Sequence, residues 1–106
     1  MSPIRMTQIT ALVLQAIASG HQYGFDVMEA CGLPSGTVYP ALRRLEKGGF
    51  LRSGWESARE ARAAGRPRRR SYSLTTRGQD ALLEAQAKLD EVRELLGHFG
   101  PTPKRA

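Results

Sequence analysis

The chain has 106 residues, of which 41% are hydrophobic and 25% charged, and its formal net charge at pH 7 is +6. This length suits one domain with a single modest core. A lone cysteine excludes an intrachain disulfide and a cysteine-rich metal site. The two histidines, His21 and His98, are too far apart in sequence to indicate metal ligands. We therefore expect no metal and no cofactor, and the excess of positive charge indicates a polyanionic partner.

The start of the chain passes directly from Met1 into a helical pattern, with no continuous apolar segment like that of a signal peptide. No stretch approaches the about 20 apolar residues that are needed to span a bilayer. We expect a cytoplasmic protein without a membrane segment.

Two helices are predicted in the first third of the chain. The first runs from a cap at about Thr7 to Gly20, and its apolar face carries Ile9, Leu12, Val13, Ala16 and Ile17. The second covers residues 23–30, and the residues that share its apolar face are Tyr23, Val27 and Ala30. Gly24 lies inside this helix at a cost of about 1 kcal/mol relative to alanine, which indicates a close contact with another helix.

A third helix is predicted between a start signal at Pro34 and Ser35 and a stop at Gly48. Its apolar face carries Val38, Ala41, Leu42 and Leu45. The opposite face has hydroxyl groups first and cations further along: Ser35, Thr37, Tyr39, Arg43, Arg44 and Lys47. Such a face suits a helix in the major groove of DNA, with hydroxyls near base edges and cations near phosphates. The alternative is the solvated face of an ordinary core helix.

The second and third helices are joined by a three-residue turn, Cys31 to Leu33, and together they form a helix-turn-helix pattern. Pro40 removes one backbone hydrogen bond from the third helix and crowds the carbonyl of Gly36. We therefore expect either a kink at Pro40 or a helix that becomes regular only after Tyr39.

Two strands, at residues 50–56 and 70–75, are predicted around a basic loop at residues 57–69. A helix-turn-helix followed by such a hairpin defines a winged helix. Between Arg52 and Arg77 there are eight arginines and two glutamates, so this stretch carries the whole +6 of the chain. This concentration suits a phosphate-facing surface, with Arg66 and Arg68 beside a stiffening proline and suited to a narrow minor groove. The alternative is a flexible basic loop without a target.

The last helix is predicted to open with a capping box, Thr76-x-x-Gln79. A heptad seam follows, made of Leu82, Ala85, Leu89, Val92, Leu96 and Phe99. From about Leu89 onward we expect this seam to contact a second copy of the chain, and the alternative is a helix that folds back along the first one. The expected organisation is mainly α: a winged helix-turn-helix DNA-binding domain with a two-stranded β wing (residues 1–75), a C-terminal dimerisation helix (76–99) and a flexible tail (100–106).

The chain resembles the PadR-like winged-helix transcriptional regulators. The resemblance covers nearly the whole chain, and its most specific part is Gly36-Thr37-Val38-Tyr39-Pro40-Ala41-Leu42. Further matching segments are Tyr23 to Val27, Gly65 to Arg69 in the wing, and Leu74-Thr75-x-x-Gly78. The family also carries Tyr-Pro in its recognition helix.

The resemblance implies a homodimeric transcription factor, usually a repressor, of the short C-terminal subgroup, bound to double-stranded DNA at a palindromic operator. Carried over to this chain, it implies that Ser35, Gly36, Thr37, Tyr39 and Pro40 face DNA. The DNA-binding set is completed by basic residues of the third helix and the wing: Arg43, Arg44, Lys47, Arg66, Arg68 and Arg69. Two departures matter: the wing is longer than usual and weakly helical at residues 58–64, and no domain follows the last helix. Any small-molecule effector site is therefore expected at the dimer interface.

The residues that we consider for an effector cavity are Phe25, Met28, Trp55 and Phe99, and the alternative is that they belong to the core. A second function class is a protein-interaction module whose last helix docks a different protein. An RNA-binding winged helix stays open. We expect no enzyme, because the sequence has no nucleophile–base pair, no carboxylate pair and no phosphate-cradling glycine loop.

Overall fold

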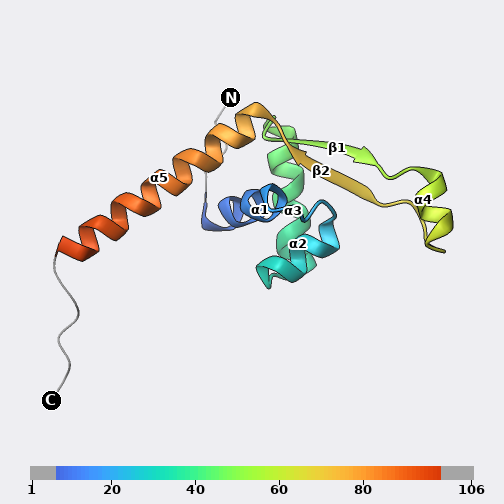
Figure 1. Ribbon diagram of the computed structural model, residues 1–106, viewed down its shortest axis with the longest axis horizontal. Helices are drawn as coiled ribbons and strands as arrows, with labels where there is room; N and C mark the ends of the chain where they lie inside the picture. Colours follow the sequence, from blue (N-terminus) through green and yellow to red (C-terminus); the bar gives the residue numbers. More distant parts are fainter. Residues whose placement is uncertain (1–6, 99–106) are drawn as a thin grey trace, which may run out of the picture.

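The computed structural model describes residues 7–98 (Figure 1). Along the chain the elements are α1 (Gln8–Ala18), α2 (Gly24–Cys31), α3 (Ser35–Lys47), β1 (Leu51–Trp55), α4 (Ala58–Ala63), β2 (Arg70–Leu74) and α5 (Thr76–His98). Figure 1 shows α1, α2 and α3 gathered together, the β hairpin with α4 at its tip extending to one side, and α5 extending to the other. The predicted mainly helical fold with a two-stranded wing is confirmed.

The core lies between the three N-terminal helices and the base of the hairpin. Its fully buried side chains come mainly from α1 and α3, among them Val13, Leu14, Val38, Leu42 and Leu45. The predicted apolar face of α1 is wrong at its start, because Ile9 and Leu12 are exposed while Thr10 and Leu14 are buried. The reason is that α1 has two neighbours: Leu14 faces the core, whereas Leu12 borders a groove beside α5.

α2 begins one residue later and ends one residue later than predicted. Tyr23 is its N-cap in an extended conformation, and Gly32 ends it with a left-handed φ of 66°. Cys31, which was assigned to the turn, is helical and packs against the core, and its thiol donates a hydrogen bond to the Leu12 carbonyl at 3.6 Å. Ala30 is exposed, so its predicted place on the apolar face is wrong.

α3 follows the predicted bounds, with Pro34 as its N-cap and Gly48 as its C-cap. The helix is already regular at Ser35, so the expectation that it becomes regular only after Tyr39 is wrong. The amides of Thr37 and Val38 both donate to the Pro34 carbonyl at 3.0 Å, which secures the first turn before Pro40 interrupts the hydrogen-bond ladder.

β1 and β2 pair antiparallel, in a register that runs from Leu51 opposite Leu74 to Trp55 opposite Arg70. The weak helix expected in the connecting loop is present as α4, where the Ser57 side chain caps the Glu60 amide. An isolated bridge between Tyr23 and Ser71 ties the outer edge of β2 to the start of α2. The hairpin is therefore attached to the helix-turn-helix through β2 as well as through the chain connection.

α5 is capped by Thr75, not by Thr76 as predicted. The Thr75 hydroxyl accepts a hydrogen bond from the Gly78 amide at 3.1 Å and donates one to the Gly49 carbonyl at 2.6 Å. The first half of α5 packs on α1, where Leu82 is buried and the Gln86 amide donates to Gln15 at 2.7 Å. The alternative given for the last helix, folding back along the first one, therefore holds for the first half of α5. Phe99 and the predicted tail at 100–106 lie outside the described residues.

Candidate nucleic-acid interface

The polar face of α3 lies at the surface of the molecule. Thr37 and Pro40 are partly buried, and the remaining candidates on this helix are exposed: Ser35, Gly36, Tyr39, Arg43, Arg44 and Lys47. The opposite face is buried, as Val38, Ala41, Leu42 and Leu45 are fully enclosed. The helix thus presents hydroxyls in its first turn and cations in its second half to solvent.

Tyr39 is placed by a contact with α2. Its side chain is 39% exposed, and a Cβ atom added to Gly24 would come within 2.6 Å of the Tyr39 ring. The close helix contact predicted at Gly24 is therefore present, and its partner is one of the candidate DNA-contacting side chains. The sequence did not show this pairing, because nothing local links residues 15 positions apart.

The wing arginines converge on one acid that the sequence analysis did not single out. Glu56 follows β1 directly, and its side chain is only 2% exposed. Arg66 forms a two-pronged ion pair with its carboxylate, and Arg69 reaches the same carboxylate at 3.1 Å. Arg68 donates from Nε to the Glu56 carbonyl at 2.6 Å. The one signal in the sequence is that Glu56 is an acid within an arginine-rich stretch.

The carboxylate of Glu56 is strongly acidic. The hydrogen bond from Arg66 lowers the pKa of Glu56 to about 2; burial opposes this shift, and Arg69 adds to it. The same pairing raises the pKa of Arg66. These opposite shifts favour the ionised forms of both Glu56 and Arg66, so the pair stays charged around neutral pH.

A second cluster joins α3 to the hairpin. The Glu46 carboxylate at the end of α3 accepts a hydrogen bond from Ser53 of β1 and one from Arg70 of β2 at 3.2 Å. Arg70 also donates to the Ser53 hydroxyl at 2.8 Å and lies over the Trp55 ring at 5.7 Å. This cluster holds the hairpin beside the C-terminal part of α3.

Several arginines in and beside the hairpin remain exposed to solvent, Arg68 and Arg70 among them in spite of their hydrogen bonds. The exposed arginines of this part of the chain are Arg52, Arg59, Arg62, Arg68, Arg70 and Arg77. Arg66 and Arg69 remain partly exposed, with 32% and 39% of their side chains accessible beside the Glu56 pair. The basic stretch therefore forms a surface rather than an internally neutralised cluster.

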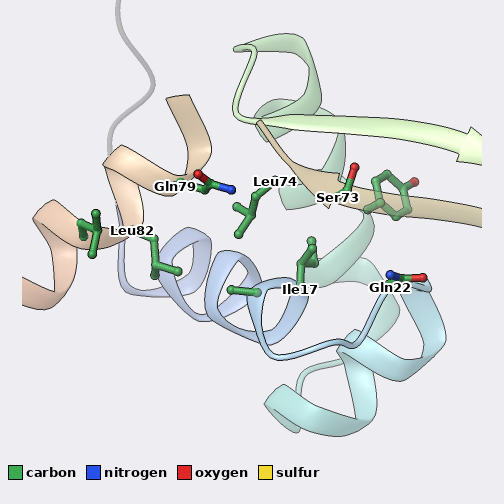
Figure 2. Close-up of a pocket in the computed structure, with 9 residues that line it drawn as sticks. Ile17, Gln22, Ser73, Leu74, Gln79 and Leu82 are labelled. Atoms are coloured by element: carbon green, nitrogen blue, oxygen red, sulfur yellow. The ribbon is translucent and has the colours of Figure 1, made fainter. Parts of the chain in front are cut away.

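Two grooves border α5. Figure 2 shows the first, of about 480 Å³, where Ile17 of α1, Ser73 and Leu74 of β2 and Leu82 of α5 meet. The second, of about 580 Å³, runs between α1 and α5 and is largely apolar; Leu12, Ala85, Leu89 and Val92 are among its lining residues. Three of the residues considered for an effector cavity do not line either groove: Phe25 and Trp55 are both 61% exposed, and Met28 packs against the core. The fourth, Phe99, lies outside the described residues.

Within residues 7–98, no three His, Cys, Asp or Glu side chains gather as metal ligands would. Among the helices of this part of the chain, none combines the length and the hydrophobicity that a bilayer crossing requires.

A helix-turn-helix whose second helix presents a polar face, followed by a basic antiparallel hairpin, defines the winged-helix class of DNA-binding proteins. Within that class the chain belongs to the transcriptional regulator PadR-like family, whose model matches residues 13–84. It is thus a DNA-binding transcription regulator. A comparison with curated protein sequences finds no match.

Solved structures share the fold over most of the chain. A PadR family transcription regulator from Clostridium difficile R20291 is 23% identical, with a TM-score of 0.76 over 88% of this chain and 98% of that one. A PadR-like transcriptional regulator from Bacillus cereus ATCC 14579 is 18% identical, with a TM-score of 0.74 over 90% and 93%. A protein from Streptococcus mutans UA159 is 24% identical, with a TM-score of 0.74 over 99% and 98%.

Proposed function

We propose that this regulator is a homodimeric repressor that binds a palindromic operator, with the α3 helices of two copies in successive major grooves about one helical turn apart. The observation that carries the proposal is the attachment of a basic hairpin to the exposed polar face of α3 through Glu46, Ser53 and Arg70. These bonds hold the hairpin against α3, which supports an interface where the helix meets base edges and the wing meets phosphates.

Within this interface the two elements have different tasks. Ser35, Gly36, Thr37 and Tyr39 would approach bases or adjacent phosphates, and Pro40 would pack against a thymine methyl group. The cations would neutralise phosphates; they are Arg43, Arg44 and Lys47 on α3 and Arg66, Arg68 and Arg69 in the wing. The partial exposure of Arg66 and Arg69 is consistent with contact to phosphate through the N–H groups that Glu56 leaves free.

The experiment begins with selection of binding sites from random duplex DNA, which would give half-site, spacing and symmetry together. Tyr39→Ala should then weaken binding to the selected operator by about 1–3 kcal/mol and weaken binding to random DNA less. Arg68→Ala should weaken binding to both and flatten the salt dependence by about one unit. Arg93→Ala on α5 removes the same charge away from this face, at a side chain that is 70% exposed, and should leave the operator preference unchanged. Selection without an enriched site, or full affinity in the Tyr39 variant, would contradict the proposal.

The dimer is proposed from α5. Beyond its first half, the apolar side chains are at least half exposed: Leu89, Val92, Leu95 and Leu96. Leu12 of α1 is also 48% exposed, and it lines the groove between α1 and α5 together with Leu89 and Val92. The surface that a second copy would cover therefore extends from the predicted seam (Leu82, Ala85, Leu89, Val92, Leu96 and Phe99) onto α1.

Sedimentation tests the dimer directly. Leu96→Asp should convert a dimer to a monomer at micromolar concentration, because a buried unpaired carboxylate opposes association. Ala87→Asp places the same charge on an exposed position outside the seam and should leave the mass unchanged. A wild-type chain that sediments as a monomer, and gains mass only with a different protein, would favour the second candidate function, an interaction module that docks another protein through α5.

We place an effector site in the groove between α1 and α5, whose volume of about 580 Å³ falls within the range that small molecules occupy. A ligand there acts on DNA binding only if it favours one spacing of the two recognition helices over the other. Titration of apolar ligands should change operator affinity in the wild type and have less effect in Leu12→Ala. Equal responses in both would argue against this site.

A further inference from the structure

The wing contains one buried charged residue, Glu56, although the segment that it begins is largely exposed to solvent. Within residues 7–98, Glu56 is the only charged residue that is buried, and its side chain is 2% exposed. A carboxylate removed from water is costly unless it is paired and hydrogen-bonded. Here the pairing comes from Arg66 on both carboxylate oxygens and from Arg69 at 3.1 Å.

Hydrogen bonds of Glu56 also join the two ends of the long segment that connects β1 and β2. The Glu56 amide donates to the Arg69 carbonyl at 2.8 Å, and the Glu56 carbonyl accepts from Arg68 Nε at 2.6 Å. Backbone and side chain of one residue therefore hold Arg66, Arg68 and Arg69, three cations of the proposed DNA interface. Ordering rotamer-rich side chains before binding reduces the entropy that association would otherwise lose.

The same carboxylate is connected to the recognition helix. The Arg69 guanidinium lies over the Tyr23 ring, 3.6 Å from its centroid. Tyr23 is the N-cap of α2 and precedes Gly24, against which the Tyr39 ring of α3 packs. Glu56 is thus linked through Arg69 to Tyr23, and Tyr23 is followed in the chain by Gly24, which contacts the Tyr39 ring.

We propose that Glu56 is a positioning residue for DNA binding, which fixes the wing arginines in place and sets the wing against α3 before DNA arrives. This inference rests on the proposed DNA-binding role of the wing. It makes a prediction opposite in sign to simple electrostatics. Removing a negative charge from a DNA-facing surface should strengthen binding to a polyanion, whereas loss of a positioning group should weaken it.

The test compares Glu56→Gln with Glu60→Gln, which removes the same charge from an exposed position of α4. The probe is a labelled mixed-sequence DNA duplex about three helical turns long, titrated at several salt concentrations. We expect Glu56→Gln to bind about five- to tenfold more weakly than wild type, because the freed arginines must be ordered on binding. Glu60→Gln should bind as tightly as wild type or more tightly. Equal or tighter binding by Glu56→Gln would overturn the proposal.

Two further measurements separate this inference from other failures. Amide hydrogen exchange in the free protein should lose protection at Glu56 and its neighbours in Glu56→Gln but not in Glu60→Gln, and unchanged protection would overturn the proposal. If Glu56→Gln does not fold, Arg66→Lys keeps the net charge but removes the two-pronged pair, and it should weaken binding where Arg93→Lys on α5 does not. If the wild-type chain does not bind duplex DNA at low salt, the proposed function itself is refuted before any variant is compared.

Discussion

Gly78 determines how closely α5 can approach the turn between α3 and β1. A Cβ atom added at Gly78 would lie 2.1 Å from the Phe50 carbonyl oxygen and 2.9 Å from Cδ2 of Leu74. Ordinary contacts of a Cβ begin at about 3.4 Å, so Gly78→Ala requires a displacement of more than 1 Å at a backbone atom. No side-chain rotation can provide that displacement, so α5 must move away from the turn.

The free energy of that movement follows from what it disturbs. The Phe50 carbonyl also accepts a hydrogen bond from the Thr75 amide at 3.2 Å, and Phe50 itself is buried. Overpacking of a tight contact costs about 1–3 kcal/mol and a lost hydrogen bond costs about 1 kcal/mol. Because alanine is favoured over glycine within a helix, the substitution also regains up to about 1 kcal/mol. We therefore expect Gly78→Ala to lower the free energy of unfolding by about 1–3 kcal/mol.

Chemical denaturation followed by circular dichroism, at one fixed protein concentration, measures this difference. The matched control is Gly36→Ala, a helical glycine with no atom within 4 Å of the added Cβ. It should be neutral or stabilising by up to about 1 kcal/mol. If Gly78→Ala is as stable as wild type, α5 does not approach the turn as closely as the structure places it.

Three further predictions concern the site and its supports. Gly24→Ala should displace the Tyr39 ring and weaken operator binding, as measured by fluorescence anisotropy, while the free energy of unfolding changes less than in Gly78→Ala; unchanged affinity would show that the ring position does not matter. Thr75→Ala should destabilise the fold by about 1–2 kcal/mol in thermal denaturation and Thr76→Ala by much less, because only Thr75 caps α5; equal effects would contradict that assignment. The pKa of Glu56 is lowered from 4.5 to about 2 in the folded chain, so its contribution is complete above pH 4.5 and is lost as the pH falls towards 2. The free energy of unfolding of Glu56→Gln, measured as a function of pH, should therefore fall less steeply between pH 4.5 and 2 than that of wild type, by a slope that corresponds to up to about one proton. Equal slopes in variant and wild type would refute this prediction.

The elements that the sequence predicted best are those whose signals are local. α3 begins after Pro34 and ends before Gly48, because the proline and glycine at its ends act within a few residues of where they stand. The two strands and the weak helix between them were predicted for the same reason. The α2 boundary was displaced by one residue because Cys31, a small apolar side chain, gains more by packing against the core than by joining the turn.

The features that the sequence did not predict depend on contacts between distant positions. Thr75 and Thr76 are equally good caps by residue type, and the choice between them is made by the Gly49 carbonyl, 26 residues away from Thr75. The basic charge of the wing was visible in the sequence, but the convergence of Arg66 and Arg69 on Glu56 was not. Periodicity gave α1 an apolar face without showing that Leu14 and Leu12 serve different neighbours.

The first half of α5 is covered by the chain's own core and its second half is exposed, so the two halves are under different constraints. Leu82 contacts the chain's own core, so a substitution there alters folding. Leu96 contacts little of its own chain, so a substitution there acts mainly on contacts with other molecules. Residues 93–98 can therefore vary with little effect on the core that supports α3 and the wing. Under the proposed dimer, exchange of this segment between related regulators would change which chains pair, while each keeps its own preferred DNA site.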